Sequence, residues 1–303
     1  MPGRNASTTQ GAHGVRRAIV AVARHRVLAR AALLAVLFHS SFACSGCGGK
    51  PLAAKPEPRG PQAPALVFVH GLGGSPADWL DVANALGRDH RVVLEALPGH
   101  AHCVMVDSLP LEAAAADVAR RARALGGPVV LVGHSLGGAV AVRAALLDTA
   151  NVVGLVLVET ALRPQMAPSE RDGVRQAFRT DYAAAVREVY ASFASNQRQA
   201  GELAREAASL DPAAFATWLD DALHEDLAAR AAALRVPVLV VLSPRSWPES
   251  ESWSVTAESL GYAHVAGVTP VRIASSGHFV MLDRPAQLEA TIREWLAQLP
   301  QRR

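Results

Sequence analysis

Cysteine is scarce in this sequence. Only three cysteines occur among its 303 residues, and two of them, Cys44 and Cys47, share the stretch CSGC. A single CxxC pair with no second pair and no nearby histidine pair makes a poor zinc site. The third cysteine, Cys103, has no obvious partner, so no disulfide framework is expected.

Aromatic residues are few as well, at 5%, although half of all residues are hydrophobic. The core must therefore consist mainly of Ala, Val and Leu. Acidic residues are absent from residues 1–43, which carry six arginines. Removing these six from the 30 Lys and Arg residues leaves 24, against 27 Asp and Glu. The rest of the chain is therefore slightly acidic, and a nucleic-acid partner is not expected.

Long hydrophobic runs are also missing. The run AALLAVLF, residues 31–38, is too short to span a bilayer as a mature helix and follows the arginine-rich start. This pattern predicts an export leader over residues 1–47. The leader also resembles a bacterial lipoprotein signal, with Cys44 or Cys47 as the acylated residue. The usual aliphatic residue three positions earlier is missing, so a lipid anchor and simple secretion to the periplasm or medium are both open.

Beyond the leader, residues 48–64 are rich in Pro, Gly and charge and predict an extended tether. Short apolar runs then alternate with helical patterns, and the runs lack polar alternation, as do parallel strands buried on both faces. The predicted strands are residues 65–70, 91–96, 128–133, 152–159, 236–242 and 269–274. The predicted helices are residues 76–87, 111–126, 136–149, 253–263 and 284–299. The order predicts an α/β fold with a doubly wound, mostly parallel sheet.

The alternation is interrupted between residues 160 and 235. This stretch is Ala-rich and helical in pattern, with proline-marked junctions and no convincing strand. Ligands bind at the carboxyl ends of the strands in such sheets, so the stretch is interpreted as a helical cap, or lid, over that edge. Its apolar residues suggest a substrate with an apolar group.

The motif GHSLG, residues 133–137, is the sharpest chemical signal. It is a G-x-S-x-G sequence between a predicted buried strand and a predicted helix, which is the context that a nucleophile on a tight turn requires. Ser135 is therefore the candidate nucleophile. The N-terminus of the following helix directs N–H groups, led by that of Leu136, toward developing negative charge.

A second glycine-rich stretch, HGLGG at residues 70–74, follows the first predicted strand. The N–H of Leu72 is expected to complete an oxyanion hole with that of Leu136. Among 11 histidines, His278 is the candidate base, because it follows the last predicted strand in a glycine-containing loop. We expect His70 to brace its own loop, and His134 to lie on the wrong side of the turn to serve Ser135.

In order and spacing, HGLGGS, PGH (98–100), GHSLGG and SGHFVMLDRPAQLEATIREWL resemble motifs of the α/β-hydrolase fold superfamily. The resemblance covers roughly residues 65–299 and implies a serine esterase- or lipase-like protein with a helical lid. It implies a nucleophile at Ser135, a base at His278 and oxyanion N–H groups at Leu72 and Leu136. The first two strands of the family have no clear counterpart.

The acid of the expected triad is displaced. In most of the family it follows the strand corresponding to residues 236–242, where this chain has Ser246. Glu249 or Glu251 could reach back from the same loop, or Glu159 could serve from the end of the preceding strand, as in some family members. Neighbouring strands lie about 4.8 Å apart, so Glu159 is favoured because its strand is closer to that of the nucleophile.

The sequence thus predicts a carboxylic ester hydrolase with Ser135, His278 and Glu159 as a triad, acting on a small-molecule ester. This chemistry requires neither a metal nor an organic cofactor. Thioesterase and carbon–carbon bond hydrolase activities use the same residues. A non-catalytic binding protein that has lost the acid is the alternative from another class.

Overall fold

The computed structural model describes residues 63–100 and 110–300. The predicted leader, Cys44, Cys47, Cys103 and nearly all of the predicted tether lie outside the described residues. Within the described part of the chain, no helix is both long and apolar enough to cross a membrane. The same part contains no group of three His, Cys, Asp or Glu side chains arranged to hold a metal ion.

Six parallel strands form one sheet, in the order β2-β1-β3-β4-β5-β6. Their bounds are β1 Ala65–Val69, β2 Val92–Glu95, β3 Val129–His134, β4 Val152–Val158, β5 Val238–Leu242 and β6 Val268–Arg272. Each falls within one residue or two of a predicted strand, so the prediction of a parallel α/β sheet is confirmed. The order places β4 between β3 and β5, which decides the geometry of the site.

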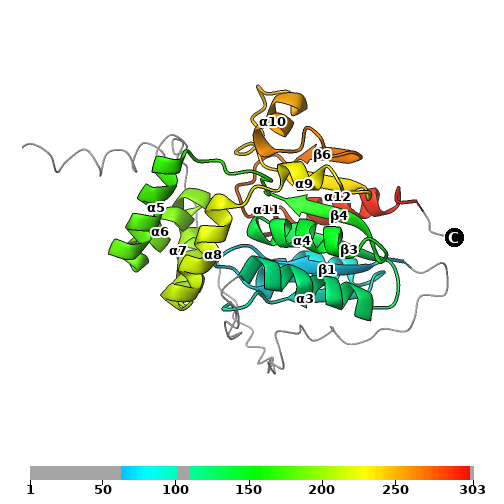
Figure 1. The fold of residues 1–303 in the computed structure, drawn as a ribbon, viewed down its shortest axis with the longest axis horizontal. Coiled ribbons are helices and arrows are strands. Elements are labelled where there is room, and N and C mark those ends of the chain that lie inside the picture. The colour runs from blue at the N-terminus through cyan, green and yellow to red at the C-terminus, as the bar shows by residue number, and fades with distance from the viewer. Residues whose placement is uncertain (1–62, 101–109, 301–303) are drawn as a thin grey trace, which may run out of the picture.

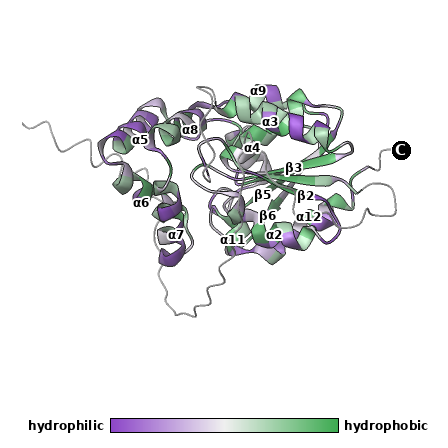
Figure 2. Cartoon of the chain, turned by 90° about the horizontal axis from the view of Figure 1, so that it is seen from below, coloured by the Kyte–Doolittle hydropathy of each residue, from purple (hydrophilic) through white to green (hydrophobic). Residues whose placement is uncertain are grey.

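Helices cover both faces of the sheet (Figure 1). They are η1 Pro76–Trp79, α2 Leu80–Leu86, α3 Pro110–Ala124, α4 Leu136–Leu147, α10 Trp253–Leu260, α11 Val280–Asp283 and α12 Pro285–Leu296. In Figure 2 the strands lie between α3, α4 and the short α9 (Ala228–Ala231) on one side and α2, α11 and α12 on the other, with apolar segments turned inward. Alternate strand residues fill two cores. Val67 and Val69 pack with one set of helices, and Leu66 and Phe68 pack with the other.

Helices also fill the stretch between β4 and β5. They are α5 Pro168–Thr180, α6 Tyr182–Phe193, α7 Gln197–Ala208, α8 Pro212–His224 and the short α9 Ala228–Ala231. We call α5 to α8 the insertion. It stands apart from the sheet on one side, beyond the carboxyl ends of the strands (Figure 1). Its core includes the stacked rings of Phe178 and Phe215, whose centroids lie 5.1 Å apart, and is continuous with the sheet core that contains Leu66 and Phe68.

Polar contacts join the insertion to the sheet layer. Arg143 of α4 donates two hydrogen bonds, of 2.8 and 2.9 Å, to the carboxylate of Glu225, the residue that ends α8. The buried Trp218 of α8 donates from Nε1 to the carbonyl of Pro98 at 2.8 Å. These bonds fix the insertion beside α4 and the loop that follows β2.

Candidate active site

Ser135 occupies a strained turn between β3 and α4. Its φ and ψ are 51° and −120°, a conformation that residues other than glycine rarely adopt. The chain can reverse here because glycines flank the serine. A Cβ atom on Gly133 would lie 2.5 Å from the carbonyl oxygen of Gly137, and a Cβ on Gly137 would lie 2.5 Å from that of Val69. Both distances are too short for real atoms, so the glycines of the motif are required by contact.

Glu159 directly follows β4, one strand from the nucleophile strand. It also has a positive φ, of 50°, while its N–H still extends the ladder to the carbonyl of Val241 at 2.9 Å. Its side chain is fully buried. A carboxylate that is buried in this way is costly unless hydrogen bonds or an opposite charge compensate it.

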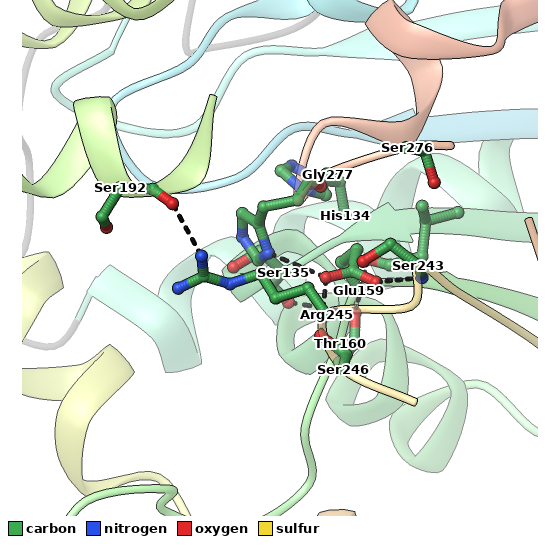
Figure 3. A network of polar contacts seen from close by, with 12 residues as sticks. His134, Ser135, Glu159, Thr160, Ser192, Ser243, Arg245, Ser246, Ser276 and Gly277 are labelled. Atoms are coloured by element: carbon green, nitrogen blue, oxygen red, sulfur yellow. Dashed lines mark hydrogen bonds and ion pairs between the residues drawn. The ribbon is translucent and has the colours of Figure 1, made fainter. Parts of the chain in front are cut away.

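Three donors surround that carboxylate (Figure 3). Oε1 accepts from the N–H of Ser243 at 2.5 Å, and Oε2 accepts from the hydroxyl of Ser246 at 2.7 Å. Oε2 also lies 3.2 Å from Nδ1 of His278. The structure therefore brings Glu159 to His278, in agreement with the argument from strand spacing. Ser246, at the position where an acid was expected, donates to the Glu159 carboxylate instead.

The other two candidate acids lie elsewhere. Glu251 accepts a hydrogen bond from Thr256 Oγ1 at 3.2 Å, and its own carbonyl accepts from Trp247. The side chain of Glu249 is exposed. Within the described residues neither of them has a hydrogen bond to His278, so the structure does not assemble the alternative acid.

His278 lies between β6 and α11 and is held from the insertion. Its N–H donates to the carbonyl of Phe193 at 3.3 Å, and the two rings stack with centroids 4.6 Å apart. The preceding N–H, of Gly277, donates to Asp283 Oδ2 at 2.7 Å. Ser195 Oγ donates to the same oxygen at 2.5 Å. With Nδ1 directed to a carboxylate, Nε2 of His278 is available to exchange a proton.

His134 supports this loop from below. Its Nε2 lies 2.9 Å from the carbonyl oxygen of His278, so the neutral ring donates there. Burial, assisted by the neighbouring His278, holds the pKa of His134 well below its usual value. Its place between the sheet and the loop agrees with the expectation that it does not serve Ser135.

In the loop after β1, the Leu72–Gly73 peptide is held by two hydrogen bonds, which we call the clamp. The carbonyl of Leu72 accepts from the hydroxyl of Tyr190 at 2.6 Å, and the N–H of Gly73, in the same unit, donates to Nε2 of His100 at 3.0 Å. His70 braces the loop, as expected, because its Nε2 accepts from the N–H of Leu97 at 3.1 Å. Burial lowers the pKa of His70 to about 3 and that of His100 to about 4. Both rings therefore stay neutral at pH 7 and can accept.

The clamp fixes the backbone at Leu72, in the loop after β1. The start of α4 packs against the beginning of the same loop, because a Cβ on Gly137 would contact the carbonyl oxygen of His70. Leu136 is the first residue of that helix, and the first N–H groups of a helix have no partner inside it. The arrangement can therefore supply backbone donors near Ser135. Sequence reasoning missed Tyr190, Phe193 and Arg245, which contact this region from distant parts of the chain. Of the clamp it noted only PGH, which contains His100, as a family motif.

Comparison with known proteins agrees with this geometry. The family model described as "Alpha/beta hydrolase family" matches residues 66–291. The chain is 30% identical over 253 residues to polyketide synthase ThaQ of Burkholderia thailandensis. The aligned region covers 78% of this chain and 12% of that protein. It is 38% identical over 104 residues to pimeloyl-(acyl-carrier protein) methyl ester esterase of Vibrio atlanticus, which covers 33% and 38%. The chain thus aligns with less than half of the length of either curated relative.

A solved structure is similar over more of its length. A thermophilic esterase from Thermogutta terrifontis, determined with malate bound, superposes with a TM-score of 0.66 at 25% identity. The match covers 78% of this chain and 90% of that one. Together with the family model, which matches most of the chain, the parallel sheet and the strained serine turn, this identifies the chain as a member of the alpha/beta hydrolase family.

Proposed function

We propose that this chain is a serine hydrolase that cleaves a carboxylic ester through an acyl-enzyme intermediate. The observation that supports it best is the contact between the buried Glu159 carboxylate and Nδ1 of His278, at 3.2 Å. A non-catalytic role was attractive only while the chain lacked an acid for its histidine. A buried glutamate in contact with His278 removes that reason.

In the proposed mechanism the Ser135 hydroxyl attacks the ester carbonyl and gives its proton to Nε2 of His278. The imidazolium then protonates the alkoxy oxygen, the carbon–oxygen bond breaks, and the alcohol leaves an acyl group on Ser135. Water attacks that acyl group by the same route, and the carboxylic acid is released as Ser135 regains its proton. Glu159 stabilises the imidazolium in both halves, and Ser243 and Ser246 hold Glu159 in place.

Negative charge on the carbonyl oxygen is assigned to the N–H groups of Leu72 and Leu136. Donors that are fixed before the reaction stabilise such an oxyanion without reorganising, which is why the clamp on the Leu72–Gly73 peptide supports this assignment. The insertion is proposed to cover this edge and exclude water. Ester cleavage, rather than another reaction of the same residues, is supported by the names of two similar proteins, both esterases.

Removal of the Ser135 hydroxyl tests the proposal. Ser135→Ala is expected to reduce hydrolysis of 4-nitrophenyl acetate and butyrate by at least about 10⁴-fold, because no nucleophile is left. Thermal unfolding should change little, since one hydroxyl at a turn contributes little packing. Ser254→Ala is the matched control, because it removes an exposed serine hydroxyl on α10. In the wild-type protein, mass spectrometry should find a fluorophosphonate adduct on Ser135. Unchanged turnover in Ser135→Ala would refute the assignment.

A further inference from the structure

Arg245 stands in the loop after β5 in which the acid was expected. Its Nη1 donates to the carbonyl of Ser192 at 2.6 Å. Its guanidinium carbon lies 5.0 Å from the ring centroid of Phe193, the same ring that stacks on His278. Figure 3 shows the Arg245 side chain extending past Glu159 toward Ser192. Arg245 is thus oriented by the insertion and lies beside the candidate site.

An open pocket of about 360 Å³ lies at this position. Its lining comes from three separate segments, which are the end of α6 with the residues after it, the His278 loop, and Arg245 itself. Its polar lining includes the four serines Ser192, Ser195, Ser275 and Ser276. Because Gly277, the neighbour of His278, also lines it, a molecule in the pocket would lie against the loop that carries His278.

The charge of Arg245 has no ion-pair partner within the described residues. The two nearby carboxylates are already satisfied by other donors. Glu159 accepts from Ser243, Ser246 and His278, and Asp283 accepts from three groups that hold the His278 loop and α7. Burial lowers the pKa of Arg245 and the charge of Glu159 raises it, but a guanidinium remains protonated at neutral pH.

The hydroxyls of the pocket are mostly directed back into the protein. Ser192 Oγ donates to the carbonyl of Val189 at 2.7 Å, and Ser276 Oγ donates to that of Ile273 at 2.7 Å. Ser195 Oγ donates to Asp283. A guanidinium has five N–H donors. Among the described residues, the guanidinium of Arg245 forms one hydrogen bond, to the carbonyl of Ser192. Arg245 is therefore the group with donors to spare.

We propose that Arg245 binds an anionic group of the substrate, so that this hydrolase prefers esters that carry a carboxylate. The planar guanidinium, with one face on Phe193 and one N–H fixed by Ser192, is pre-organised to bind a carboxylate through two parallel N–H···O bonds. The proposal rests on the ester-hydrolase function proposed above and specifies its substrate class.

Two matched pairs of esters test it. In the first, mono-4-nitrophenyl glutarate carries a carboxylate on the acyl part, and 4-nitrophenyl pentanoate is its neutral counterpart. In the second, 4-carboxyphenyl acetate carries the carboxylate on the alcohol part, with 4-methylphenyl acetate as the neutral counterpart. The measured quantity is the ratio of kcat/KM for the anionic ester to that for its neutral counterpart.

In at least one pair, Arg245→Gln should lower this ratio by about 10- to 100-fold, the effect of losing a hydrogen-bonded charge. The loss should appear mainly in KM, and Arg245→Lys should recover part of it. Arg187→Gln is the matched control, because Arg187 is exposed on α6 and its loss changes the net charge equally. A ratio that is the same in wild type and Arg245→Gln for both pairs would overturn the proposal. An equal loss of kcat/KM on the neutral and the anionic esters would also overturn it, because a residue that only supports the structure would affect both kinds of ester equally.

Binding separates this proposal from the proposed function. Titration calorimetry with Ser135→Ala measures the affinity for each glutarate and pentanoate ester without turnover. If the wild type hydrolyses neither pair, ester hydrolysis is refuted. Tighter binding of the glutarate ester that is lost in Ser135→Ala/Arg245→Gln would nevertheless support the anion site, and equal binding in both proteins would refute it.

Discussion

Glu159 and Ser246 come from the loops after two neighbouring strands and meet in one hydrogen bond beside His278. Glu159, the proposed acid, directly follows β4, the strand beside that of the proposed nucleophile, and Ser246 in the loop after β5 contributes a hydroxyl that holds it. Glu159 adopts a positive φ to do so, a conformation that costs of order 1 kcal/mol or more and persists where the surroundings impose it. The three donors around the carboxylate supply that constraint.

At the scale of single residues, Glu159→Gln should reduce kcat by up to about 10⁴-fold, the effect of changing a triad acid to its amide. An amide cannot stabilise the imidazolium and can favour the wrong tautomer of His278. KM should change little, because the side chain is buried against His278 and does not face the substrate. Steady-state kinetics on 4-nitrophenyl butyrate measure both parameters.

Glu249→Gln and Glu251→Gln serve as controls in the same assay and should be close to wild type. Ser246→Asp in the Glu159→Gln background places a carboxylate at the commoner family position, where the present hydroxyl is 2.7 Å from Oε2 of Glu159. Partial recovery of the rate is expected. If Glu159→Gln is near wild type while a variant of the β5 loop collapses, the acid lies after β5.

Ser135 and Glu159 were predicted because each directly follows a buried strand, and His278 because it lies in a glycine-containing loop after the last strand. The contacts that join this region to the insertion could not be found this way. Tyr190 contacts a carbonyl 118 positions away in the sequence, and Arg245 contacts one 53 positions away. Such contacts depend on how packed helices meet the sheet, and neither periodicity nor a local motif encodes that.

At the scale of elements, α6 reaches both loops of the candidate site. Tyr190 holds the carbonyl of Leu72, and Phe193, at the end of the same helix, holds the N–H and the ring of His278. Strands β1 to β5 were predictable because apolar runs of four to seven residues with little polarity have few other stable arrangements. The last strand, β6, is more polar and partly exposed. The docking of α6 follows from contacts that are distant in sequence, so only the helical pattern itself was visible.

Tyr190→Phe should therefore lower kcat by about 10- to 100-fold, somewhat less than the loss of a whole oxyanion donor. Without the hydroxyl, the Leu72–Gly73 peptide keeps only its bond to His100, so the proposed oxyanion N–H is less well oriented. KM should be nearly unchanged, because no contact to substrate is removed.

Tyr182→Phe is the matched comparison. Its hydroxyl donates to the carbonyl of Ala207 at 2.8 Å, inside the insertion. This variant should lose some thermal stability and little activity. Equal effects of the two variants on kcat would show that the insertion matters only as a packed body and that the clamp on Leu72 has no role.

At the scale of the whole molecule, buried histidines should make stability dependent on pH. His70 and His100 have pKa values lowered to about 3 and about 4, and His134 has one well below 6.5. A group with a depressed folded-state pKa binds more protons when unfolded. The contribution of these neutral histidines to the free energy of unfolding is therefore present above pH 6.5 and is lost as the pH falls toward 4. The free energy of unfolding decreases by about 1.4 kcal/mol per pH unit for each additional proton that the unfolded state binds.

Asp78 acts in the opposite direction. Burial raises the pKa of its carboxyl to about 7, so its stabilising contribution is present below pH 3.8 and is lost as the pH rises through 7. Because the effect of three histidines on the pH dependence is larger than the opposite effect of one aspartate, the free energy of unfolding should decrease toward acid pH. Urea unfolding at pH 7.5, 6 and 5 measures it. Asp78→Asn should be more stable than wild type at pH 8 and lose stability more steeply below pH 6. A wild-type protein that gains stability on acidification would contradict this.

The attachment of both loops of the candidate site to one helix has a consequence for recombination between family members. In a chimera that received a foreign insertion, the new helices would have to supply a hydroxyl for Leu72, and a ring and a carbonyl for His278. Without them the serine turn would remain intact while its partners lost their alignment. The insertion is therefore not expected to be interchangeable between family members as a unit. A chimera that keeps the sheet of this chain would also have to keep Tyr190 and Phe193.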